Sequence, residues 1–576
     1  MQEKKLTGYP SIDKPWLKYY SEEAINAPLP ECTIYEYLWE NNKDHLDDIA
    51  IIYFNRKITY GELFENIDKT ASALLALGVK PGEIVTVAMP SIPEALYAVY
   101  ALNKIGAVAN MIHPLAGEQE LLNYLNEVES KVFLMFTGTY EIVKDALSKT
   151  SVKTSVVVSP AQSLSSALKC LYKFKSKDVK IKSSSELMNW SAFIEKGDGV
   201  KAEKAEKDCH EMALISHTGG TTGEPKGVMC SDYNLNALIY QIVCNFKYDR
   251  KGCSLVVLPP FINYSLIEAT LAMLAIGYRV VLIPKYEPDK FTEYIKKYHP
   301  SVVLSIPAYW SALLENQKKT DMSCFEHIYY GGEGMSEENE NTINEYILSC
   351  GSNKKLCKGL GSTELVAAAS QSFQECNPIG SVGIPLVRTN CAVVDPDTNR
   401  ELSFNLIGEL CFSGPTLMLG YYKNRIATNE IVKVHTDGQR WLHTGDLGYI
   451  TPEGIIYITG RIKRIIVTKG SDGVATKMFP DRIEKVLSQH LAVDLCCVIG
   501  VKDEVRIHYP KAFVVLNNGY TASDKLTEDI RAFCKDKLPG YMIPDEIEYL
   551  PDLPRTSRGK IDYRALEKQA EEMSKE

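Results

Sequence analysis

The sequence predicts an α/β protein of two or more domains that ends in a small α+β unit. Three observations support this fold class. The chain has 576 residues, which is more than one ordinary hydrophobic core accommodates. Strand-like and helix-like segments alternate from about residue 59 onward. The residues after Gly460 are more charged than those before, so we expect a domain boundary near residue 460.

The first helix of this alternation is predicted to begin at a capping box. Thr59 and Glu62 have the spacing at which two side chains cap a helix N-terminus reciprocally. Apolar residues then recur at helical spacing over 63–75, and Gly78 ends the helix.

The segments that follow continue the pattern, which is typical of a parallel or mixed sheet with helices on both faces. We expect strands at 84–88, 132–136 and 156–158 and a helix at 92–105; in the last unit we expect helices at 481–490 and 526–537 and strands at 496–501 and 512–516.

Residues 160–210 interrupt this alternation and are rich in serine and lysine. Lysines such as Lys169 and Lys173 are interspersed with apolar residues such as Leu168 and Tyr172. A basic amphipathic element of this kind could contact an anionic lipid surface. The alternative is a solvated helix or loop at the rim of the protein.

Composition excludes several classes of protein. With 45% hydrophobic and 24% charged residues, the chain is typical of soluble globular proteins. A net charge of -9 argues against nucleic acid as a partner. No apolar run is long enough for a membrane span, and none at the N-terminus is typical of a secretory signal. The fifteen cysteines form no CxxC pair, so we expect reduced thiols and a cytoplasmic protein.

The stretch 212–227, MALISHTGGTTGEPKG, carries the clearest chemical signal. A short apolar strand precedes six residues that are all threonine or glycine, namely Thr218, Gly219, Gly220, Thr221, Thr222 and Gly223. Glycines let backbone amides approach phosphate oxygens, threonines add donors, and Lys226 supplies charge. Pro225 stands where a Walker A loop has glycine. The alternative is a flexible turn without a ligand.

Four further segments complete a series: GLGSTE at 359–364, WLHTGDLGYI at 441–450, GRIK at 460–463 and PRTSRGKIDYRAL at 554–566. From about residue 33 to 566, in motif order, the sequence resembles the adenylate-forming superfamily of acyl-CoA synthetases, nonribosomal adenylation domains and luciferases. The resemblance implies a large multi-sheet N-terminal domain, 1–461, and a small mobile α+β C-terminal domain, 462–576.

The resemblance also implies roles in ATP binding. The phosphates would be bound by the 218–223 loop with Lys226, and the adenine pocket would be lined by the GGEG segment at 331–334. The nucleotide-binding residues outside that loop would be Gly332, Glu333, Gly361, Thr363, Asp446 and Arg461. Asp446 would accept hydrogen bonds from the ribose hydroxyls. Glu364 and Thr222 would bind Mg²⁺, which neutralises phosphate charge.

The resemblance assigns catalysis to Glu364 and to two lysines of the last unit. Lys560 matches the family's adenylation lysine. Adenylation brings the acid carboxylate and the α-phosphate of ATP together, and a cation that reaches both lowers the barrier to their reaction. Lys469 would assist the thioester step, and its alternative is a solvated loop lysine. Lys463 occupies the hinge position. The segment 408–422 matches a family segment that we interpret as scaffold.

The sequence departs from the family pattern at four places. Leu360 replaces the usual aromatic residue before Gly361, Asp232 and Ile262 stand where histidine is common, and the 470–480 loop is longer than usual. Asp232 and Ile262 would lie near the acid-binding side.

We therefore expect an ATP-dependent ligase that activates a fatty or aromatic acid as acyl-AMP and transfers it to coenzyme A. One alternative is a stand-alone enzyme that loads the phosphopantetheine arm of a carrier protein. Another is a non-catalytic nucleotide-binding relic. Apolar residues favour an apolar acid pocket but could equally be core; they are Phe261, Tyr264, Leu266, Ile306, Tyr309, Trp310 and 365–369.

Overall fold

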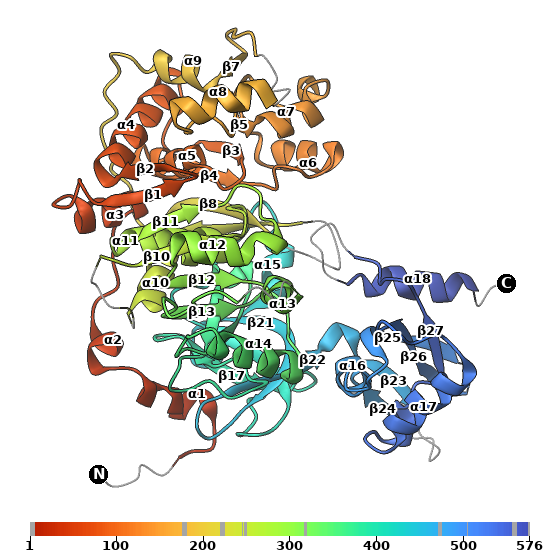
Figure 1. Cartoon of the computed structure of the whole chain (residues 1–576). Coiled ribbons are helices and arrows are strands. Elements are labelled where there is room, and N and C mark those ends of the chain that lie inside the picture. The colour runs from red at the N-terminus through yellow and green to blue at the C-terminus, as the bar shows by residue number, and fades with distance from the viewer. Residues whose placement is uncertain are drawn as a thin grey trace.

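The computed structural model describes residues 6–175, 181–218, 225–244, 246, 250–315, 319–469, 475–503, 505–555 and 561–573. Its larger part, up to residue 461, contains three sheets that lie one below another in Figure 1. The elements that follow form a separate C-terminal unit beside them. This arrangement agrees with the predicted multi-sheet region followed by a small α+β unit.

The first sheet is mostly parallel and carries helices on both faces. Its strands, in spatial order, are β19 (Gly420–Tyr421), β9 (Gly227–Ser231), β8 (Met212–His217), β4 (Val108–Met111), β3 (Ile84–Ala88), β5 (Val132–Phe136), β6 (Thr154–Val158) and β7 (Leu187–Asn189). Helices α4 (Tyr60–Ala76), α5 (Pro93–Lys104) and α9 (Trp190–Lys196) share one core with this sheet, and α6 (Glu118–Val128) and α7 (Thr137–Val143) share another.

Local sequence signals determine where these helices and strands begin and end. The side chain of Thr59 accepts a hydrogen bond from the Glu62 amide, and the Glu62 side chain accepts one from the Thr59 amide, so the predicted capping box begins α4. Gly78, with φ +82°, follows the end of that helix. The predicted strands at 84–88 and 132–136 are β3 and β5, and the predicted helix at 92–105 is α5 with its flanking residues.

The second sheet lies below the first in Figure 1 and shares a large core with it. Its strands, in spatial order, are β16 (Ile384–Pro385), β15 (Ala368–Gln371), β14 (Cys357–Gly361), β13 (His327–Tyr330), β12 (Val302–Ser305), β10 (Cys253–Val256), β11 (Arg279–Leu282), β1 (Ile49–Tyr53) and β2 (Arg56–Thr59). The shared core also includes residues of α10 (Asp232–Val243), α11 (Ala272–Ala275) and the π-helix η3 (Tyr264–Leu271). Helices α12 (Phe291–Tyr298), α13 (Pro307–Glu315) and α14 (Glu337–Ser349) cover the other face.

The third sheet packs against the N-terminal segment. It contains β17 (Asn390–Val394), β18 (Gly408–Ser413), β21 (Arg440–Ile450), β20 (Val432–Val434) and β22 (Ile456–Arg461). Trp16 and Tyr20, which lie in or next to the short helix η1 (Pro15–Tyr19), are buried in the core of this sheet. The long strand β21 leads to β22, the last element of the large part.

The C-terminal unit has cores of its own. It contains β23 (Ile466–Lys469), β24 (Ala475–Met478), α16 (Pro480–Leu487), β25 (Val493–Asp503), β26 (Ile507–Leu516), α17 (Asp524–Lys535), β27 (Glu546–Tyr549) and α18 (Tyr563–Met573). The predicted elements of this unit correspond to α16, β25, β26 and α17. The buried residues of its two cores all lie at or after Ile466.

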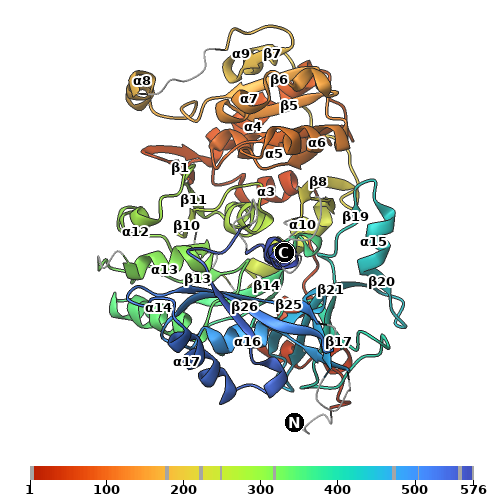
Figure 2. The ribbon, with the colours of Figure 1, turned by 90° about the vertical axis from the view of Figure 1, so that its right-hand side faces the viewer.

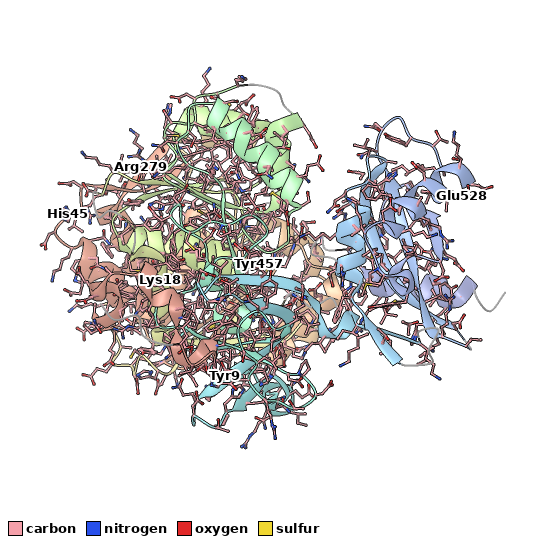
Figure 3. The ribbon with its side chains drawn as sticks, turned by 90° about the horizontal axis from the view of Figure 1, so that it is seen from below. Tyr9, Lys18, His45, Arg279, Tyr457 and Glu528 are labelled. Carbon is pink, nitrogen blue, oxygen red and sulfur yellow. The ribbon has the colours of Figure 1, made fainter. Side chains whose placement is uncertain are left out.

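Among the residues that the structure describes, two ion pairs join the C-terminal unit to the large part. Lys485 Nζ lies 2.7 Å from Glu337 Oε1, and Lys477 Nζ lies 3.0 Å from Asp397 Oδ2. All four side chains are exposed. In Figure 3, Glu528 lies on the side of the unit that faces away from the large part, so α17 is remote from this junction.

The lysine-rich segment contains more structure than the sequence indicates. Besides α8 (Ser166–Lys175), which lies at an outer edge in Figure 2, it contains β7 and α9, whose Trp190 and Phe193 are buried. Leu168 and Tyr172 pack against the main core, which favours the solvated rim helix over a lipid-facing one. The side chains of Lys173 and of the lysines at 175–180 lie outside the described residues. Among the described residues, no helix combines the length and apolarity needed to cross a membrane.

Candidate functional site

The predicted phosphate loop connects β8 and β9 as an antiparallel hairpin. At its neck, the Thr218 amide donates to the Lys226 carbonyl over 3.0 Å, and the Lys226 amide donates to Thr218 Oγ1 over 3.0 Å. The residues 219–224 between them, with Gly219, Gly220, Thr221, Thr222 and Gly223, lie outside the described part. Since β8 runs parallel to β4, its carboxyl end, from which the hairpin projects, is where open α/β sheets bind ligands.

A tyrosine connects this hairpin to the predicted magnesium-binding acid. Lys226 Nζ lies 5.3 Å from the centre of the Tyr421 ring. The Tyr421 hydroxyl donates a 2.7 Å hydrogen bond to Glu364 Oε1. Burial, with the nearby Glu364 carboxylate, raises the pKa of Tyr421 well above its usual value, so the phenol stays protonated. A lysine and an acid from distant segments therefore contact one phenol ring.

Tyr421 contacts two predicted site residues, although the sequence analysis did not single it out. It lies in the 408–422 segment, for which the sequence predicts a scaffold role, and it reaches Lys226 and Glu364. β19 pairs with β9, which places Tyr421 opposite Val228, two residues beyond Lys226. An aromatic pair at 421–422 directly after a conformationally free glycine was the available signal, but the partner of that strand could not be inferred from local sequence.

The GLGSTE segment forms a tight turn at the end of β14. A Cβ added at Gly361 would lie 1.7 Å from the carbonyl oxygen of Ala367, so only glycine fits there. Thr363 and Glu364 follow in the short helix η5 (Thr363–Leu365), and the Met418 amide donates to the Glu364 carbonyl over 2.9 Å. Leu360 packs against the core of the third sheet. The backbone that carries Thr363 and Glu364 is thus held by the close approach of Gly361 to Ala367 and by the hydrogen bond from Met418.

The GGEG segment follows β13 at the carboxyl end of the same sheet. The Gly331 amide donates to the Ser305 carbonyl over 3.1 Å, which continues the pairing of β12 with β13. Gly332 has a φ of +81°, in the region that favours glycine, and Glu333 is exposed. The Tyr264 ring lies against Gly331, with Cζ 3.5 Å from a Cβ built on that glycine.

Asp446 and Arg461 face each other across two strands of the third sheet. They are register partners of β21 and β22, and Arg461 Nε lies 2.9 Å from Asp446 Oδ1. The Asp446 side chain is 10% exposed and that of Arg461 is 59% exposed. The structure therefore brings together the two residues that the resemblance assigns to the ribose. Arg461 is also the last residue of β22, two residues before the predicted hinge residue Lys463.

The two predicted catalytic lysines belong to the C-terminal unit. Lys469 is the last residue of β23; it is exposed, and its amide donates to the Arg506 carbonyl over 2.8 Å. The long loop 470–474 lies outside the described residues. So does Lys560; the described residues nearest to it in the chain, Arg555 and Ile561, form an antiparallel bridge. Both positions remain predictions.

Two departures from the family pattern occupy different surroundings. The Asp232 carboxylate is buried and accepts hydrogen bonds from the Ile34 amide (3.0 Å), from Asn103 Nδ2 (2.6 Å) and from Lys207 Nζ (3.0 Å). It thereby holds three segments together, which is a structural role rather than one in acid binding. Ile262 is 37% exposed.

The predicted apolar pocket residues divide into two groups. Leu266, Trp310 and Leu365 are at most 2% exposed and belong to the hydrophobic cores. The partly buried residues remain candidates for a pocket wall, and they are Phe261, Tyr264, Ile306 and Tyr309.

A sequence model described as AMP-binding enzyme matches residues 38–422, and one described as AMP-binding enzyme C-terminal domain matches residues 482–560. The chain belongs to the AMP-binding enzyme family.

Relatives of this AMP-binding enzyme match it over nearly their whole length. A long-chain-fatty-acid–CoA ligase of Bacillus subtilis is 27% identical over 565 residues, which is 96% of this chain and 97% of that protein. A probable 4-coumarate–CoA ligase 1 of Dictyostelium discoideum is 27% identical over 552 residues, or 94% and 96% of the two chains. The crystal structure of ATP-bound MatB from Rhodopseudomonas palustris has a TM-score of 0.80 at 21% identity and covers 94% of this chain and 99% of that one; this likeness shows the fold.

The phenol of Tyr421 gives a first testable prediction for this AMP-binding enzyme. Tyr421→Phe removes a hydrogen bond to a carboxylate, an interaction worth about 1.5–3 kcal/mol, so kcat/KM for acid-dependent pyrophosphate release should fall about 10- to 100-fold. Tyr422→Phe is the matched control: Lys423 Nζ, and not Lys226, lies over its ring, 5.4 Å from the centre. Equal activities of the two variants would contradict a role for Tyr421.

Proposed function

We propose that this enzyme is an ATP-dependent carboxylate–CoA ligase. It first joins an acid to AMP with release of pyrophosphate, and it then transfers the acyl group to the thiol of coenzyme A. The observation that carries the proposal is the contact of Lys226 and Glu364 with the single ring of Tyr421. A cation for phosphate oxygens thereby lies over the ring of one phenol and an acid for a metal ion at its hydroxyl, next to the phosphate-loop hairpin. The family membership and the relatives named as CoA ligases support the proposal.

The large part, 1–461, would bind ATP and the acid. The Thr218–Lys226 hairpin would hold the triphosphate, and Asp446 with Arg461 would hold the ribose, where the carboxylate accepts the hydroxyl protons. The GGEG turn after β13 would line the pocket of the adenine base. This arrangement fixes both ends of the nucleotide, so that the α-phosphate is presented to the acid carboxylate.

Magnesium would be held by Glu364, together with Thr222 of the hairpin. A carboxylate is the kind of oxygen ligand that Mg²⁺ prefers, and Glu364 lies next to a phenol that also contacts the phosphate-loop lysine, so the site suits the ion. When bound, the ion would neutralise charge on the departing pyrophosphate. Tyr421 and the Met418 amide hold Glu364 in place.

The C-terminal unit, 462–576, would supply a different lysine for each half-reaction. Lys560 would bind both the acid carboxylate and the α-phosphate of ATP during adenylation. Rotation about Lys463 would then withdraw Lys560 and present the loop at Lys469 to the thiol. Two orientations are needed because one cleft is not optimal for two transition states.

The acid would be fatty or aromatic, in keeping with the partly buried residues near η3. A carrier-protein phosphopantetheine as acceptor is less well supported than free coenzyme A, because the relatives described above are CoA ligases. The fifteen cysteines are all free, which supports a reducing compartment such as the cytoplasm.

The experiment that tests this function measures both half-reactions. Purified enzyme is offered ATP, Mg²⁺ and a panel of fatty and aromatic acids, and exchange of labelled pyrophosphate into ATP is recorded. We expect acid-dependent exchange, followed by acyl-CoA formation when coenzyme A is added. Pyrophosphate exchange without acyl-CoA formation would support only the adenylation half-reaction. The absence of exchange with every acid would overturn the proposed function.

A further inference from the structure

A buried carboxylate on α14 contacts the two strands that carry the predicted nucleotide-lining turns. Glu340 is 0% exposed. Its Oε2 accepts a 3.0 Å hydrogen bond from the Tyr330 hydroxyl, and its Oε1 accepts one from Lys358 Nζ. Tyr330 and Lys358 are buried as well, and they belong to β13 and β14. Three segments of the chain therefore meet at one carboxylate.

The two partners of Glu340 lie directly next to the turns. Tyr330 is the last residue of β13 and precedes the GGEG turn, and Lys358 precedes the GLGSTE segment. Tyr330 and Lys358 are register partners of parallel strands, so their side chains leave the same face of the sheet. Glu340 bridges these two side chains. It thereby fixes the spacing of the strand segments from which both turns emerge.

Helix α14 is attached to the start of β14 by a second polar contact. The Leu356 amide donates to Asn344 Oδ1 over 2.7 Å. Asn344 lies four residues after Glu340, which places it on the same face of the helix. Ile343 and Ile347 of α14 lie in the apolar core on this side of the second sheet. The helix is therefore a fixed support against which Glu340 holds β13 and β14.

The energetics of this network suit positioning better than stabilisation. Buried ions lose their hydration, and replacement of a buried ion pair by apolar residues is often neutral or stabilising. A charge-assisted hydrogen bond, in contrast, fixes both distance and direction. Burial, with the nearby Glu340 carboxylate, raises the pKa of Tyr330 far above its usual value, so the phenol stays a donor. Each oxygen of Glu340 thus has one donor from one strand.

We propose that Glu340, through Tyr330 and Lys358, positions the two turns that bind the nucleotide. All three are positioning residues, because they act on ATP through the glycine-rich turns that follow β13 and β14. The inference rests on the proposed function, to which the roles of these turns belong. It adds a determinant of ATP affinity on a helix that the proposed function does not use.

An apolar replacement of the whole network separates positioning from stability. The triple variant Tyr330→Phe/Glu340→Leu/Lys358→Met leaves none of the three polar groups without its partner, so it should melt near the temperature of the parent. ATP binding, measured by calorimetry with Mg²⁺ and without acid, should weaken about 10- to 100-fold, because a displacement of about 1 Å can cost that much. Melting and ATP affinity that both match the parent would overturn the proposal.

Tyr330→Phe alone is a milder variant that keeps the shape of the network. Glu340 retains Lys358, so no charge is left unpaired and the protein should fold. The lost hydrogen bond to a carboxylate should raise the KM for ATP about 3- to 10-fold, which is part of what such a bond is worth. The KM for the acid should not change. An unchanged KM for ATP would contradict the proposal even if the triple variant did not fold.

Lys207 provides the matched control for a buried lysine. Its Nζ lies 3.0 Å from Asp232 Oδ2, and the side chains of this pair are 5% and 0% exposed, against 2% and 0% for Lys358 and Glu340. Lys207→Met and Lys358→Met each leave a buried carboxylate without its cation, so both should lower the melting temperature. Only Lys358→Met should weaken ATP binding. An equal loss of ATP affinity in the two variants would mean that lost stability is the cause, and positioning would be refuted.

ATP binding is measured without an acid, so the positioning role and the proposed function can fail separately. If an acid supports pyrophosphate exchange and every variant binds ATP like the parent, the ligase activity stands and only the positioning role is refuted. If no acid supports exchange but the network variants bind ATP weakly, the positioning role stands and the ligase function fails. If the parent does not bind ATP, both are wrong.

Discussion

Replacement of Lys560 by alanine is expected to slow acyl-AMP formation by about 100- to 1,000-fold, the range found when one preorganised electrostatic group is removed from an active site. Attack by a carboxylate on the α-phosphate brings two anions together, and a lysine that reaches both offsets their repulsion. Pyrophosphate release with a saturating acid is the measurement. The second half-reaction, measured with supplied acyl-AMP and coenzyme A, should be nearly unaffected.

A second lysine of the same unit provides the control for Lys560. Lys568 lies on α18, is 78% exposed and has Glu572 as its ion-pair partner at 3.9 Å. Lys568→Ala removes the same charge from the unit and should leave both half-reactions at the parent rate. An equal loss of both half-reactions in Lys560→Ala would refute the division of labour between Lys560 and Lys469.

The substitution Gly361→Ala is expected to have the largest combined effect on folding and activity. The new Cβ would lie 1.7 Å from the Ala367 carbonyl oxygen, a backbone atom that no rotamer change can move away. Overpacking typically costs about 1–3 kcal/mol and occasionally more, and a clash with backbone belongs at the upper end of that range. The turn must shift, and with it Thr363 and Glu364, and a displacement of about 1 Å can lower the rate about 100-fold.

Thermal unfolding and pyrophosphate release measure the two parts of this effect. Gly540→Ala serves as the matched control, since a Cβ at Gly540 meets no atom within 4 Å. It should change the melting temperature little. A Gly361→Ala protein that melts and reacts like the parent would show that the turn tolerates a side chain, and the close approach would then not position Glu364.

Features encoded by neighbouring residues could be predicted from the sequence. The capping box of Thr59 and Glu62 is complete within four residues, and β3 and β5 are short apolar runs with clear ends, so both appear where they are expected. Asp446 and Arg461 were each assigned to ribose binding through a motif. Their direct contact follows from the register of β21 and β22, which are adjacent in the sequence.

Contacts between distant segments could not be predicted in this way. Tyr421 reaches Glu364 only because β19 joins the edge of the first sheet next to β9, and no local pattern encodes that pairing. The partners of Asp232 come from residues far before it in the chain, so its departure from the family pattern was interpreted as a substrate feature.

The junction between the two parts of the molecule is expected to respond to salt. Its two ion pairs, Lys485 with Glu337 and Lys477 with Asp397, join exposed side chains, and such pairs contribute at most about 1 kcal/mol each. Salt screens exposed charges further. Helix α16 also packs against β22 at this junction, so the two ion pairs are the part of the interface that added salt is expected to weaken.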